Sequence, residues 1–67
     1  MPEKVKVLCD GPVVQVGDLV QTTVGGTLAW FPRKLVYDFD AERREVVIPR
    51  WLAEEKDVEH RAVEVPR

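Results

Sequence analysis

The 67 residues are enough for one domain, residues 1–67, and for no more. Ten basic and twelve acidic residues give a net charge of −2, a balance that suits a soluble surface and gives no general signal for binding polyanions. Cys9 is the only cysteine and His60 the only histidine, which excludes an internal disulfide and a zinc site built by one chain alone. No apolar run reaches the length of a membrane span, and the first residues lack the apolar core of a signal peptide. We therefore expect no membrane contact and a cytoplasmic location.

The composition favours strands and leaves few candidate nucleophiles. Thirteen residues are valine, whose stiff, branched side chain favours pleated structure over helix. Serine is absent, which removes the commonest hydroxyl nucleophile. A core built from so short a chain is marginal, and small domains often gain stability from a partner chain. Self-association or binding to another protein is therefore a reasonable expectation.

The first part of the chain reads as short strands separated by turns. Residues 4–9 alternate between polar and apolar side chains with one apolar exception, as a half-buried strand does. Residues 10–12 supply turn chemistry. Two apolar runs follow at 13–16 and 19–24, and Gly17-Asp18 between them fits either a hairpin turn or a bulge.

The strongest turn signal is Gly25-Gly26. Two glycines in a row allow the positive φ values that a two-residue hairpin needs. Residues 27–31 are then the return strand, with Leu28 and Trp30 on one face. Pro32 ends the ladder because it has no N–H to donate.

A further hairpin and one helix complete the predicted elements. Residues 35–39 and 45–48 have strand character and are joined by a charged loop. The helix is expected to begin at Pro49, since proline is tolerated at the first helical position. Residues 50–56 are mostly good helix formers. We expect this helix to dock on the sheet through Trp51 and Leu52.

The tail beyond Lys56 supports two interpretations. Apolar residues at helical spacing would extend the helix to the C-terminus. Alternatively, residues 62–65 form a final strand with Val63 and Val65 on one face. We favour a helix that ends near Glu59 and is followed by an extended tail.

The case for catalysis is thin. Cys9 ends a valine-rich strand with no histidine nearby in sequence, which is typical of a small buried hydrophobe. His60 lies in a charged tail and is expected to face solvent. Phosphate cradling is not indicated, because no lysine or helix follows Gly25-Gly26 as a P-loop requires. Carboxylates gather around the tip of the middle hairpin without calcium-loop spacing, at Asp38, Asp40, Glu42 and Glu45. We predict no enzyme, no metal, no cofactor and no small-molecule substrate.

A binding function depends on aromatic residues that lie close to cations. Such residues can stack bases and contact phosphates, as single-strand binders do. These residues form two clusters, one at 30–34 and one at 50–51. The clusters would meet only if the strands at 27–32 and 45–49 lay in one sheet. The alternative, which we favour, is that the two tryptophans are core residues in a domain short of aromatics. The candidate binding residues are Trp30, Phe31, Arg33, Lys34, Arg50 and Trp51.

Residues 30–36 and 46–56 together resemble a recurrent group of short proteins encoded by phages, prophages and other mobile elements. The pattern is an aromatic-x-Pro-Lys/Arg turn, a short acidic spacer, and a Val-x-Ile-Pro-x-Trp-Leu-Ala-Glu join between strand and helix. The resemblance implies a small β-structure closed by a short helix, and an accessory role in replication, recombination or countering host defence. Where that group commonly continues with glycine after the helix, this chain has Asp57-Val58. The left-handed helix stop that glycine usually provides is therefore missing.

The predicted fold is mainly β: a curled antiparallel sheet or SH3-like or OB-like barrel of five to six strands, with one short helix near residues 49–57. The predicted function is a non-catalytic protein-interaction module of phage or mobile-element type. Its partner would be a host complex, which the module inhibits or to which it serves as an adaptor, or a second copy of the chain. The alternative is a nucleic-acid-binding accessory domain in DNA replication or recombination.

Overall fold

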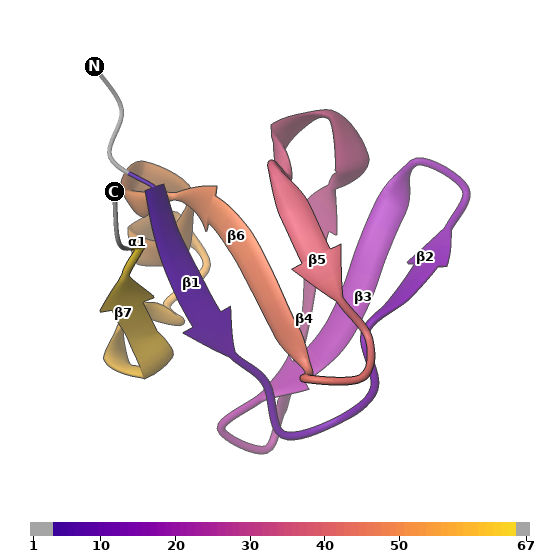
Figure 1. Cartoon of the computed structure of the whole chain (residues 1–67), viewed down its shortest axis with the longest axis horizontal. Helices are drawn as coiled ribbons and strands as arrows, with labels where there is room; N and C mark the ends of the chain where they lie inside the picture. The colour runs from indigo at the N-terminus through magenta and orange to yellow at the C-terminus, as the bar shows by residue number, and fades with distance from the viewer. Residues whose placement is uncertain (1–3, 66–67) are drawn as a thin grey trace.

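The structure is a computed structural model that describes residues 4–65. Within that range it contains seven strands, one α-helix and two 3-10 turns (Figure 1). The strands are β1 (Lys4–Leu8), β2 (Val14–Val16), β3 (Leu19–Val24), β4 (Thr27–Pro32), β5 (Asp38–Asp40), β6 (Glu45–Pro49) and β7 (Ala62–Glu64). The helix is α1 (Arg50–Glu55), and the 3-10 turns are η1 (Arg33–Leu35) and η2 (Glu59–Arg61).

The strands form two antiparallel sheets. Sheet A has the order β5-β6-β1-β7, and sheet B has the order β2-β3-β4. Two tight hairpins join the strands of sheet B, at Gly17-Asp18 and at Gly25-Gly26, and all three glycines have positive φ. Their glycines therefore supply the backbone conformation that two-residue hairpins require. The positions predicted for these turns from the sequence are confirmed, with a hairpin and not a bulge at Gly17.

One hydrophobic core lies between the two sheets. Alternate residues of each strand point inward, so that sheet A contributes mainly valines and sheet B contributes the only buried aromatic ring, Phe31. Helix α1 adds Leu52 and Ala53 beside the sheets, and Val58 follows it into the core. The fully buried side chains are Phe31, Ile48, Leu52, Val5, Val7, Val20 and Val46.

Helix α1 ends in a left-handed turn although no glycine follows it. Asp57 has φ +59°, the conformation that glycine usually provides at this position. Its N–H donates to the Glu54 carbonyl at 3.2 Å, and the Val58 N–H donates to the Ala53 carbonyl at 2.9 Å. These two bonds form a Schellman motif, and burial of Val58 against the core holds the aspartate in a strained backbone conformation.

The mainly β class with one short helix is confirmed, but several finer predictions are wrong. Residues 4–65 form seven strands where five or six were expected, and these strands form two sheets without closing a barrel. The helix ends at Glu55, before the end near Glu59 that the sequence favoured, whereas the expected extended tail is confirmed, since Ala62–Glu64 form strand β7. Trp51 does not pack into the core with Leu52, because 46 % of its surface is exposed. The helix begins at Arg50 and not at Pro49 as expected, because Pro49 is still extended (ψ 147°) as the last residue of β6 and precedes the helix as its N-cap. The first turn directs Trp51 outward and Leu52 inward.

Candidate interaction surface

The outer face of sheet B is defined by rows of side chains that lie opposite one another across its three strands. One row is Val14, Gln21 and Trp30, and the next is Val16, Leu19 and Pro32. Residues directly opposite in an antiparallel pair project from the same face. Thr23 and Leu28 extend the face toward the Gly25-Gly26 turn.

This face is apolar and open to solvent. Leu28 is 64 % exposed, and the other large apolar side chains, Val14, Val16 and Trp30, are about half exposed. None of the side chains that β2, β3 and β4 place on this face is charged, although a third of the chain is charged overall. Contiguous exposed apolar surface of this kind marks interaction sites on small soluble proteins.

Lys56 supplies one positive charge at the β4 edge of the face. Its Nζ lies 4.0 Å from the centre of the Trp30 ring, a cation–π contact. The Schellman turn after α1 holds the backbone of Lys56 at this place. A hollow of about 140 Å³ lies between β4 and the segment after α1, lined among others by Leu28, Ala29, Lys56 and His60.

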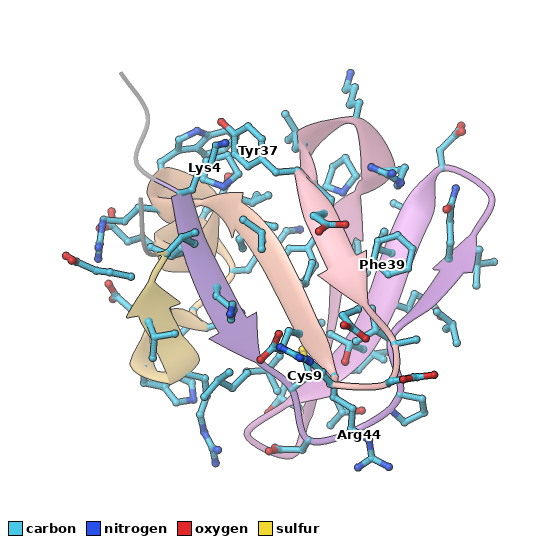
Figure 2. The ribbon with its side chains drawn as sticks, in the orientation of Figure 1. Lys4, Cys9, Tyr37, Phe39 and Arg44 are labelled. Carbon is cyan, nitrogen blue, oxygen red and sulfur yellow. The ribbon has the colours of Figure 1, made fainter. Side chains whose placement is uncertain are left out.

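The outer face of sheet A has the opposite character. Its central row is Val63, Lys6, Val47 and Asp38, and the Lys6 ammonium lies 3.7 Å from the Glu45 carboxylate. Lys4 extends over the Tyr37 ring with its Nζ 4.7 Å from the ring centre, and Figure 2 shows these two side chains together at one end of the sheet. The other residues on this face are Leu8, Glu45 and Asp40.

The structure separates the aromatic residues predicted to bind. Trp30 is 45 % exposed and Trp51 is 46 % exposed, so the expectation that both are core residues is wrong. Phe31 is fully buried, and a partner cannot reach its ring. Strands β4 and β6 lie in different sheets, so the two clusters do not meet at the end of one sheet.

The predicted cations are held by contacts within the chain to different degrees. The Arg33 guanidinium donates to the Val36 carbonyl at 2.9 Å and stacks on Phe39. Arg50 forms an ion pair with Glu64 at 3.6 Å. Lys34 is exposed in η1, the 3-10 turn that follows β4.

Sequence reasoning missed Val14, Val16 and Lys56 as parts of a surface. The apolar run at 13–16 was recognised, but one run does not reveal which side chains have a second sheet above them. Lys56 was read only as a helix former, and its contact with Trp30 depends on how α1 is placed beside β4.

Cys9 has the surroundings of a structural thiol. It is partly buried, and its Sγ lies 3.6 Å from the Val7 carbonyl oxygen. Burial raises the pKa of the Cys9 thiol above its usual value, while a hydrogen bond with Thr22 works in the opposite direction. A raised pKa disfavours the thiolate, which is the reactive form.

No group of three or more metal-binding side chains occurs among residues 4–65. No helix in that range is long and apolar enough to cross a membrane. No protein-family model matches the chain, and neither a curated protein nor a solved structure matches it significantly. The resemblance to small phage-encoded proteins therefore stays a prediction.

Proposed function

We propose that this chain is a small non-catalytic protein-interaction module that binds its partner through the outer face of sheet B. The observation that carries the proposal is the contrast between this uncharged face and the charged remainder of the surface. Leu28 and Trp30 extend into solvent from a strand whose inner residues already complete the core. When an apolar partner surface covers this face, the apolar side chains of both leave water, which is favourable. The strands place no charge on the face, so no charged group has to lose its water.

The proposal also retains the biological setting suggested by the sequence. Proteins of phage or mobile-element type that inhibit host complexes or serve as adaptors to them can be this small, and a cytoplasmic location fits that role. Seven strands around one core also support an open relative of the SH3-like or OB-like barrels. Both points are proposals that follow from the resemblance and from the arrangement of the strands.

Nucleic-acid binding is the second candidate, favoured by the half-exposed Trp30 ring with Lys56 beside it. An exposed aromatic on a sheet next to a cation is a platform on which bases can stack. The rest of the face has no cation to contact phosphates, and the net charge is −2. We therefore place this function second. Titration with single-stranded and duplex DNA at two salt concentrations tests it, and salt-steep quenching of tryptophan fluorescence would support it.

Partner capture with paired variants tests the first proposal. The chain is immobilised at low density and exposed to a lysate of the cells in which the gene is found. Leu28→Asp puts a charge on the outer face of sheet B, and Val63→Asp puts the same charge on the outer face of sheet A at a residue that is 45 % exposed. We expect a partner that the wild type and Val63→Asp retain and that Leu28→Asp loses. A partner retained equally by all three would contradict the assignment of the face.

A further inference from the structure

We infer that a second copy of this chain covers the outer face of sheet B, packed face to face about a two-fold axis that passes close to Gln21. This inference rests on the proposed function, since it concerns the same face, which the dimer covers at high concentration and leaves free at the dilution of the capture experiment. Its evidence is the distribution of charge on the face, the position of Gln21 and the size of the face.

A two-fold axis imposes a condition on charge. Every residue near the axis of a symmetric dimer meets its own copy, so that a charged side chain there would face an equal charge. The outer face of sheet B meets this condition, because its rows contain only apolar and neutral polar side chains. Lys56, the cation in contact with Trp30, lies at the β4 edge and away from the middle strand. A partner of different sequence would not require this neutrality, since opposite charges could then pair across the interface.

Gln21 is the polar side chain at the centre of the face. It belongs to the middle strand β3 and lies between Val14 and Trp30 in the middle row. Its amide has no hydrogen-bond partner among residues 4–65. An amide that becomes covered needs both a donor and an acceptor, and the same amide from a second copy provides both. A paired glutamine at the axis would then fix the register of the dimer, as a buried asparagine does in coiled coils.

The size of the face sets the expected strength. Strands β3 and β4 have six residues and are about 20 Å long, β2 has three residues and is about half as long, and the three strands span about 14 Å with the usual spacing. Side chains standing on such an area expose roughly 500 Å². Two copies would bury about 1,000 Å², which is at the low end for a specific interface and corresponds to a weak dimer. The face is thus large enough for concentration-dependent pairing of whole chains packed about 10 Å apart, sheet to sheet.

Sedimentation equilibrium of the purified full chain tests the dimer with a charge exchange at the axis. We expect the average mass of the wild type to rise from 7.7 kDa toward twice that value between roughly 10 µM and 1 mM. Gln21→Glu and Gln21→Lys each place like charges opposite one another in the dimer. The dimer dissociation constant of either variant alone should therefore be at least tenfold higher than that of the wild type. An equimolar mixture of the two variants should regain the dimer, because opposite charges then meet at the axis.

Val63→Glu, which places the same charge on the outer face of sheet A, is the matched control and should behave as the wild type does. Circular dichroism confirms that each variant is folded, as the partial exposure of Gln21 leads us to expect. A folded wild type that stays monomeric at 1 mM would overturn the inference, and so would a dimer that Gln21→Glu leaves intact. The capture experiment above uses dilute chain, at which this weak dimer is dissociated. A monomeric wild type would therefore not change the expected result of the capture experiment. A failed capture would likewise not change the expected result of the sedimentation experiment.

Discussion

The outer faces of the two sheets differ in what they place in water. Sheet A presents the charged side chains of Lys4, Lys6, Glu45 and Asp38, of which Lys6 and Glu45 form an ion pair. Sheet B presents Leu28, Trp30, Val14 and Val16, which have no charged neighbour on the same three strands. Both sheets complete one core with their inner faces, so folding alone does not explain the difference. The comparison is the basis for our proposal that the outer face of sheet B contacts another molecule.

The sharpest test of this comparison uses two adjacent residues of β4. Phe31→Ala empties a fully buried aromatic site and should cost about 3–5 kcal/mol, enough to unfold a domain of this size. Trp30→Ala removes a half-exposed ring and should cost about 1–2 kcal/mol, from the buried part of the side chain and from the lost contact with Lys56. Thermal and urea unfolding measure both changes. Equal losses would mean that the outer face belongs to the core after all.

A second adjacent pair separates the two roles in helix α1. Leu52 is 2 % exposed, so Leu52→Ala should lower the free energy of unfolding by about 2–4 kcal/mol. Trp51→Ala should lower it by less, about 1–2 kcal/mol, since about half of the side chain is already in water. Urea unfolding followed by circular dichroism measures both. A large loss for Trp51→Ala would restore the core role that the sequence suggested.

The helix end beside the uncharged face offers a stabilising change. Asp57 has φ +59°, and glycine adopts this conformation without steric cost. Asp57→Gly should therefore raise the free energy of unfolding by about 0.5–1 kcal/mol. Asp57→Ala is the control, which should lower stability because alanine resists the left-handed conformation. The two variants should shift the melting temperature in opposite directions.

The charged face of sheet A should respond weakly to salt. Lys6→Gln removes the partner of Glu45, and a partly exposed pair contributes about 0.5 kcal/mol or less. The difference in melting temperature between the variant and the wild type should shrink as salt rises, because salt screens the pair. Gln21→Ala on sheet B should show no such salt dependence. If Lys6→Gln lowers the melting temperature by the same amount at all salt concentrations, the packing of the lysine side chain matters more than its charge.

Cys9 gives the smallest expected effect, and it depends on pH. Burial raises the pKa of its thiol in the folded chain above the value in the unfolded chain. Its contribution is therefore fully present below the unfolded pKa and is lost as pH rises through the folded pKa. The free energy of unfolding should fall in alkaline solution, and Cys9→Ala should make this decrease with pH less steep. Melting temperatures measured from neutral to alkaline pH check this, and identical slopes would show that the thiol does not contribute.

The sequence by itself determined the local structure. Valine-rich alternation indicated strands, Gly25-Gly26 and Gly17-Asp18 supplied the positive φ of two hairpins, and the residues after Pro49 indicated a short helix, which begins at Arg50. These features depend on the residue and its immediate neighbours, so they can be read from a single chain.

Only the tertiary structure decided which faces are covered. An alternating pattern indicates that the two faces of a strand differ in polarity, but it does not indicate which face packs against a second sheet. Phe31 is buried because sheet A packs against the inner side of β4, whereas no strand among residues 4–65 covers the outer side and Trp30 stays half exposed beside Lys56. Asp57 likewise took the place of a glycine because burial of Val58 held the turn. The surface proposed for binding is thus a product of the packing of two sheets, which no single strand encodes.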